Sequence, residues 1–157
     1  MERFIYLPLY GGLIAQDPRE LFARQGFQGQ VLAHLEDEAG ACRVQELLKS
    51  AAERECELFI SVINLGEVLY MVEGRRSLEA SQRVLAAVDQ FPIELVEVDR
   101  PLALSATRLK AGTAIGYADC FVGALAERLS ATIVTGDPDF RQIEDAVSVE
   151  WLPPDSG

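Results

Sequence analysis

Segments typical of β-strands alternate with segments typical of α-helices along most of the chain, and this alternation constrains the fold more than any other feature. Runs rich in β-branched and aromatic residues predict strands, and longer runs with apolar residues at helical spacing predict helices. The predicted strands are 3–7, 57–62, 93–98, 131–136 and 147–152. The predicted helices are 40–55, 63–76, 77–91, 100–112 and 117–130, with a short helix over 138–144. This order predicts an α/β fold: a three-layer α/β/α sandwich with a mainly parallel sheet of about four to five strands.

The chain of 157 residues is long enough for one domain with a substantial core. We expect residues 31–152 to form the main domain, because the alternation is clear there and no repeat or low-complexity linker interrupts it. Residues 1–30 form an atypical opening segment that holds the predicted strand 3–7 and then several glycines and prolines. Residues 153–157 are expected to be a loose tail.

Composition excludes some classes of function. Hydrophobic residues make up 49% of the chain and charged residues 25%, as in ordinary globular proteins. The net charge of −11 argues against a surface that coats nucleic acid. It does not exclude an enzyme that holds a metal ion between acids, and it suits a basic protein partner.

The cysteines and the single histidine limit the kinds of site. Cys42, Cys56 and Cys120 follow no metal-ligand spacing and indicate reduced thiols in a cytoplasmic protein. His34 is the only histidine, which excludes a zinc site built from histidines and favours a packing or capping role. We expect no membrane segment, because no apolar run is long enough to span a bilayer, and the first residues fit a signal peptide poorly.

Four acids lie where an open parallel sheet binds ligands, beyond the carboxyl ends of its strands. Glu67 follows strand 57–62, and Asp137 and Asp139 follow strand 131–136. Asp119 lies near the start of the helix that leads into that last strand. Carboxylates are ligands for Mg²⁺ or Mn²⁺, and such a site can activate water and neutralise a phosphodiester. The pattern therefore favours nuclease chemistry, whereas no glycine-rich phosphate loop is present.

Each acid also has a purely structural interpretation. Asp137 is a good N-cap for the short helix, with Pro138 at its first position, and Asp119 suits the dipole of its own helix. Glu67 lies on a helix that is apolar nearly all round, which predicts burial on most sides and a need for a charge partner. Alternatively, Glu67 reaches water at the rim of that helix. Gly123, one turn after Asp119, is expected to leave open space beside the carboxylate.

Two stretches, FISVINLGEVLYMV and AIGYADCFVGALAERLSATIVTGDPDF, resemble the PIN-domain ribonuclease family, and within it the VapC-like toxins of toxin–antitoxin pairs. The resemblance covers about residues 31–152. It implies an endoribonuclease that depends on Mg²⁺ or Mn²⁺ and hydrolyses phosphodiester bonds of RNA. The metal-binding and catalytic acids that it implies are Glu67, Asp119 and Asp137, with Asp139 as an accessory metal-binding acid. It also implies that Asn64 and Thr135 support the site.

The resemblance further implies partners. An antitoxin would lay an amphipathic helix into an apolar groove near helices 40–55 and 63–76, and the protein would form a homodimer. Basic residues near the acids are candidates for contacts with RNA phosphates, although a solvated helix face explains each of them singly. These candidates are Arg75, Arg76, Arg83, Arg100, Arg108 and Lys110, of which Arg75, Arg76 and Arg108 are preferred. Trp151 is expected in the core or at a dimer surface rather than as a platform for stacked bases.

The opening of the chain departs from the family pattern, in which an aspartate follows the first short strand as a metal ligand. If residues 3–7 form that strand, Pro8 stands at the aspartate position. If residues 31–41 are aligned with the first helix of the family instead, Gln28 stands there. Asp17 is the only acid between Arg3 and Arg19 that a replacement role would fit.

Two hypotheses from different classes follow from the missing acid. The first is a metal-dependent ribonuclease, weakened because it uses three acids, and it predicts cleavage that is lost on Asp119→Asn. The second is a catalytically impaired PIN module that acts mainly by binding an antitoxin or RNA, and it predicts no metal-dependent cleavage. An α/β enzyme that acts on a small molecule is a third interpretation, with less support.

Overall fold

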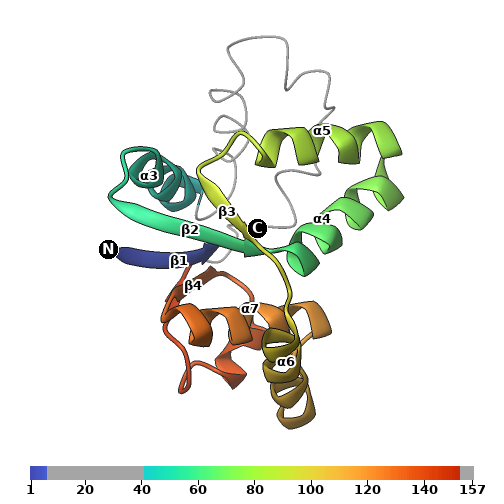
Figure 1. Ribbon diagram of the computed structural model, residues 1–157. Helices are drawn as coiled ribbons and strands as arrows, with labels where there is room; N and C mark the ends of the chain where they lie inside the picture. Colours follow the sequence, from blue (N-terminus) through green and yellow to red (C-terminus); the bar gives the residue numbers. More distant parts are fainter. Residues whose placement is uncertain (7–40, 153–157) are drawn as a thin grey trace.

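The computed structural model describes residues 1–6 and 41–152, and the strands in these residues form one five-stranded sheet (Figure 1). The strands are β1 (Glu2–Tyr6), β2 (Cys56–Ser61), β3 (Ile93–Val96), β4 (Thr132–Thr135) and β5 (Val149–Trp151). Their order is β3-β2-β1-β4-β5, and every neighbouring pair is parallel. The predicted parallel sheet is confirmed, and the first predicted strand lies at its centre.

The helices of the described residues also follow the predicted order. They are α3 (Ala41–Ala52), α4 (Val62–Arg75), α5 (Leu78–Val88), α6 (Arg100–Gly112), α7 (Tyr117–Leu129) and the 3₁₀ helix η1 (Pro138–Gln142). The short helix predicted over 138–144 is therefore a 3₁₀ helix and ends earlier. The helix predicted over 40–55 also ends early, because Arg54 adopts a left-handed backbone with φ of 61° just after it.

Successive residues of the strands face opposite sides of the sheet and build two separate cores. On one side Phe4 of β1 packs with Leu47 and Leu48 of α3. On the other side Ile5 of β1 packs with the residues of α6 and α7 that face the sheet. Figure 1 shows α3 on one side of the sheet and α6 and α7 on the other. The three-layer α/β/α sandwich is confirmed.

Helices α4 and α5 form a hairpin with a small core of its own, made by Val68, Val72, Ala80 and Val84. Because α4 begins directly after β2, it continues from the carboxyl end of the sheet (Figure 1).

The prediction that α4 is buried on most sides is wrong. Its buried residues are Asn64, Leu65, Val68 and Val72, whereas Ile63 is 37% exposed and Tyr70 is 64% exposed. The neighbouring elements therefore cover only one side of this apolar helix.

Some predictions fall outside the described residues. They concern Asp17, Gln28, His34 and the tail 153–157. Of the cysteines, Cys56 and Cys120 are buried and carry no disulfide, as expected. Among the helices within residues 41–152, none is long and apolar enough to cross a bilayer.

Candidate functional site

The charges of three of the predicted acids, Glu67, Asp137 and Asp139, act on the fourth, Asp119, near the start of α7. Asp119 lies in the first turn of α7 and is half-buried. Burial raises the pKa of its carboxyl group from 3.8 to about 6, and the negative charges of Glu67, Asp137 and Asp139 contribute to this rise. Since these charges come from α4 and from the segment after β4, the fold brings together acids that lie far apart in the sequence.

Asp137 has the capping role that its sequence context predicts, while its role as a metal ligand stays a prediction. Its Oδ1 accepts a hydrogen bond from the backbone N–H of Asp139 at 2.9 Å, so it caps η1 as predicted. Its own backbone N–H donates to Oγ1 of Thr135 at 3.0 Å, and Thr135 is only 2% exposed. The buried threonine thus fixes the segment that carries Asp137, while capping uses one carboxylate oxygen and leaves the other for a ligand.

A buried hydrogen-bond network joins the start of α4 to the start of α7. The hydroxyl of Ser61 donates to Oδ1 of Asn64 at 2.5 Å and accepts from the backbone N–H of Asn64 at 3.2 Å. Nδ2 of Asn64 donates to the carbonyl oxygen of Ala118 at 3.0 Å. Because Ala118 precedes Asp119, this network sets the position of the helix of Glu67 relative to Asp119. Asn64 thus links the two helices, and its role in supporting a metal site stays a prediction.

The loop before α7 is fastened from two sides. Nζ of Lys110, on α6, donates to the carbonyl oxygen of Ile115 at 2.7 Å. The side chain of Gln142, at the end of η1, accepts from the backbone N–H of Ala114 at 2.9 Å. The second bond links the segment that carries Asp137 to the segment that carries Asp119. Lys110, considered above as a phosphate contact, is exposed but uses its ammonium group in this intramolecular hydrogen bond.

The room that the carboxylate of Asp119 occupies exists because Gly116 has no side chain, and Gly123 does not provide it. A Cβ atom on Gly116 would lie 2.6 Å from Oδ2 of Asp119. A Cβ atom on Gly123 would instead meet Ile143 at 2.9 Å and Leu109 at 3.0 Å. The expectation of open space beside Gly123 is therefore wrong, because that position faces the packed core.

Glu67 is half-buried, and its neighbour on the same helix face, Ile63, is 37% exposed. The alternative that placed Glu67 at the rim of the helix therefore agrees with the structure. A rim position is compatible with a ligand site, since the charge of Glu67 still acts on Asp119.

The charges of the acids influence Asp119, but their side chains do not form a complete set of metal ligands. Within residues 1–6 and 41–152, no three His, Cys, Asp or Glu side chains are grouped so that they could hold a metal ion. Mg²⁺ usually keeps several waters and binds through one or two carboxylates together with phosphates of the substrate. Carboxylates are the donors that such a hydrated cation prefers, and binding of a cation by these acids stays a prediction.

The strand that should carry the first acid of the family pattern carries none at its end. After Tyr6, the last residue of β1, the sequence continues with Leu7 and Pro8. This agrees with the alignment that puts Pro8 at the aspartate position.

The preferred arginines lie on the outside of the helices. Arg75 stands at the end of α4, eight residues after Glu67, and this separation corresponds to about 12 Å along a helix. Arg76 follows as the C-cap of α4, and Arg108 is exposed on α6. Arg83 forms an ion pair with Glu79 on its own helix. Contact between RNA and Arg75, Arg76 or Arg108 stays a prediction.

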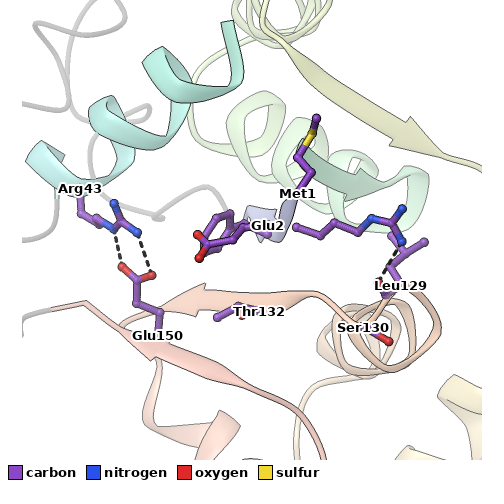
Figure 2. A pocket seen from close by; sticks show the side chains of 9 residues that line it. Met1, Glu2, Arg43, Leu129, Ser130, Thr132 and Glu150 are labelled. Carbon is purple, nitrogen blue, oxygen red and sulfur yellow. Dashed lines mark hydrogen bonds and ion pairs between the residues drawn. The ribbon is translucent and has the colours of Figure 1, made fainter. Parts of the chain in front are cut away.

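A hollow of about 560 Å³ lies near the starts of β1 and β4, lined by none of the four acids (Figure 2). Within it Arg43 of α3 forms an ion pair with Glu150 of β5 at 2.5 and 3.1 Å, and this pairing raises the pKa of the guanidinium. Arg3 pairs with Glu57 at 2.9 Å. Arg43 and Glu150 thus neutralise each other, which favours a structural role of this pair over a catalytic one.

Comparison with known proteins agrees with this architecture. The family model described as the PIN domain matches residues 30–146, and the match begins after both positions considered for the first acid. No curated protein matches the chain in sequence. The family match removes the support for an unrelated α/β enzyme that acts on a small molecule.

Three solved structures are similar along nearly their whole length. VapBC2 from Rickettsia felis, bound to a DNA fragment from its promoter, gives a TM-score of 0.63 at 18% identity and covers 98% of this chain and 100% of that chain. DNA-bound VapBC from Salmonella typhimurium gives 0.59 at 15% identity, over 96% and 97% of the chains. FitAcB from Neisseria gonorrhoeae gives 0.52 at 18% identity, over 94% and 95%. These likenesses show a shared fold, and together with the family match they lead to one conclusion: the chain belongs to the PIN domain family.

Proposed function

We propose that this protein is a metal-dependent endoribonuclease of the VapC-like toxin type, which hydrolyses phosphodiester bonds of RNA. The observation that supports this most strongly is the half-buried Asp119, whose pKa is raised to about 6 by burial and by the negative charges of Glu67, Asp137 and Asp139. Like charges brought together are unfavourable unless a cation offsets them. An enzyme that uses a divalent cation against phosphates would gain from such an arrangement.

In this proposal Glu67, Asp119 and Asp137 hold Mg²⁺ or Mn²⁺, and Asp139 is an accessory acid at the exposed rim. When bound, the cation would activate water and neutralise charge on the phosphodiester. Asp119 must be ionised to take part, so its carboxyl group is ready above about pH 6. The hydrogen bonds of Asn64 and Thr135 hold the segments that carry these acids.

The proposed partner is a cognate antitoxin. The similar structures are described as VapBC or FitAcB assemblies, two of them with DNA. The net charge of −11 favours a partner with a basic segment. We further propose that the protein forms a homodimer and acts in the cytoplasm.

A second candidate function is a catalytically impaired PIN module that mainly binds an antitoxin or RNA. Two observations favour it. No acid directly follows β1, and the described residues contain no ready group of three metal ligands. Fewer carboxylates lower the local negative charge and weaken the binding of a divalent cation.

Cleavage of single-stranded RNA by the purified protein, with Mg²⁺, Mn²⁺ or EDTA, separates the two candidates. The ribonuclease predicts cleavage that needs the metal and is lost in both Asp119→Asn and Asp137→Asn. The second variant keeps its cap, because asparagine also caps helices well. Glu150→Gln is the control, since it removes a charge from the hollow in Figure 2. RNA that stays intact with the wild-type protein would favour the binding module, and cleavage that persists in EDTA would contradict metal dependence.

A further inference from the structure

An exposed tryptophan and an arginine are stacked on each other close to the acids. Trp151 is the only tryptophan of the chain, ends β5 and is 37% exposed. The guanidinium carbon of Arg141 lies 5.1 Å from the centre of the indole ring. Of the two places expected for Trp151, this exposure contradicts the core, whereas a dimer surface stays an open prediction.

The strand pairing places this pair beside the proposed catalytic edge. Trp151 is the register partner of Thr135, and the backbone N–H of Leu152 donates to the carbonyl oxygen of Thr135 at 2.9 Å. Asp137 follows Thr135 by two residues and caps η1, and η1 carries Arg141. Neighbouring strands are about 4.8 Å apart, so the pair and Asp137 belong to one small stretch of surface.

The alternation of β5 places Trp151 on the side of the sheet that α6 and α7 cover. Glu150 faces α3, because it pairs with Arg43 of that helix. The next residue, Trp151, therefore faces the opposite side of the sheet. On that side Val149 packs against the core that α6 and α7 build.

The side chains of Trp151 and Arg141 are of the kinds that bind one nucleotide of a single-stranded nucleic acid. Indole rings and guanidinium planes are the surfaces on which unpaired bases stack, and arginine also binds phosphate oxygens in bidentate fashion. In a duplex the faces of the bases are already stacked on one another, so a single strand fits better. Arg141 also supplies positive charge beside acids that would repel a phosphate backbone.

We propose that Trp151 and Arg141 form a subsite for one nucleotide of single-stranded RNA, with the base on the exposed part of the indole and a phosphate on the guanidinium. The choice of RNA rests on the proposed function, whereas the stacked pair is a feature of the structure in its own right. The subsite would hold the strand next to Asp137 and so help to position the bond that is cleaved.

Two RNA probes test the base and the phosphate separately. One is a dye-labelled oligonucleotide of six uridines, and the other has the same backbone and label but lacks all bases. Binding is measured by fluorescence anisotropy with Mg²⁺ in the Asp119→Asn background, in which the RNA should stay intact. Into this background we would introduce Trp151→Leu, Trp151→Phe and Arg141→Gln. Arg54→Gln serves as the charge control, because Arg54 lies in the turn before β2, at the opposite end of the strands.

The subsite predicts a different pattern for each variant. Trp151→Leu should weaken binding of the uridine probe about tenfold and leave the abasic probe unchanged, because one stacked base is lost. Trp151→Phe should restore most of the affinity. Arg141→Gln should weaken both probes several-fold, whereas Arg54→Gln should change neither by more than about twofold. Because Trp151 is the only tryptophan, its intrinsic fluorescence should also change on addition of the uridine probe but not of the abasic one.

Several results would overturn the subsite. Equal affinity of Trp151→Leu and its parent for the uridine probe would do so, as would the absence of any RNA binding. Tryptophan emission that changes with protein concentration alone would show instead that Trp151 packs against a second copy. The proposed function is judged separately by metal-dependent cleavage with the wild-type protein. Cleavage with no effect at Trp151 rejects only the subsite, whereas a Trp151-dependent affinity without cleavage supports the subsite on a binding module.

Discussion

Two charged regions at the same sheet differ in how their charges are arranged. In the hollow near the starts of β1 and β4, Arg43 pairs with the opposite charge of Glu150 (Figure 2). Arg3, which also lines the hollow, pairs with Glu57 of β2. Near the start of α7, Asp119 instead meets the negative charges of other acids. The first arrangement neutralises charge within the protein, whereas the second leaves negative charge that a ligand can compensate.

The pKa values of two aspartates express the same contrast. A hydrogen bond from Arg128 lowers the pKa of Asp99 below its usual value. Burial and neighbouring acids raise the pKa of Asp119 to about 6. Both residues lie at the start of a helix, so the helix dipole alone does not explain the difference. An acid near the start of a helix is therefore not enough to indicate a ligand site. The charges of its neighbours decide whether it is already paired or can bind a ligand.

The largest effect on stability is expected at β1, the central strand of the sheet that carries both charged regions. Ile5 is 1% exposed in β1, at the centre of the sheet, and Ile5→Ala should lower the free energy of unfolding by about 3 kcal/mol. Chemical denaturation measures this, with the exposed Arg3→Ala as the control. A loss below about 1 kcal/mol would show that β1 is not a central, packed strand.

Gly116→Ala should lower the affinity for a metal ion and have little effect on the stability of the fold. The new Cβ atom would displace the carboxylate of Asp119, so we expect the affinity for Mn²⁺ to fall about tenfold. Calorimetric titration measures the affinity, and thermal unfolding reports on the fold. Gly66→Ala, on α4, is a matched control because no atom lies within 4 Å of its added Cβ. Equal losses of affinity in both variants would contradict the steric role of Gly116.

Glu150→Gln should have the opposite effect to Gly116→Ala: it should lower the stability of the fold and leave RNA cleavage unchanged. Removing its charge leaves Arg43 without its closest partner, at a cost of about 1 kcal/mol for a partly exposed pair. Chemical denaturation and RNA cleavage are the two measurements. A clear fall in cleavage without a change in stability would show that the hollow takes part in function.

The smallest effect concerns the stability of the metal-free protein. Because the pKa of Asp119 is raised from 3.8 to about 6, ionisation opposes folding above about pH 6. Asp119→Asn removes this charge and should stabilise the metal-free protein at pH 7.5 by about 0.5–1 kcal/mol, since solvent screens a half-buried group. The gain should shrink as the pH falls from 6 towards 3.8, because the wild-type carboxyl group becomes protonated. Thermal unfolding in EDTA across this range measures it, and a gain that does not vary with pH would show that the charge of Asp119 is not its cause.

Local sequence signals predicted the elements of the fold well. Helix α6 begins and ends as predicted, because Asp99 caps it, Pro101 lies in its first turn and Gly112 ends it. The mutual influence of the four acids was also expected from the sequence, since each follows a strand or begins a helix at the edge where parallel sheets bind ligands.

Features that depend on packing could not be predicted in this way. The exposure of Tyr70 depends on where α5 lies, and helical periodicity does not give that position. The space beside Asp119 comes from Gly116 because the chain turns there, and spacing along the helix pointed to Gly123 instead. The link between Gln142 and Ala114 joins residues 28 positions apart. The stacking of Arg141 on Trp151 likewise requires the pairing of β4 with β5.

Whether the acids near the start of α7 bind a metal ion is decided by calorimetric titration of Mn²⁺ and of Mg²⁺ into the antitoxin-free protein, with Asp119→Asn alongside. We expect binding to the wild-type protein that disappears in the variant. We also expect the wild-type affinity to fall as the pH drops below about 6, because protons then compete for Asp119. Absence of binding in both proteins, or equal binding in both, would contradict a metal site formed by these acids.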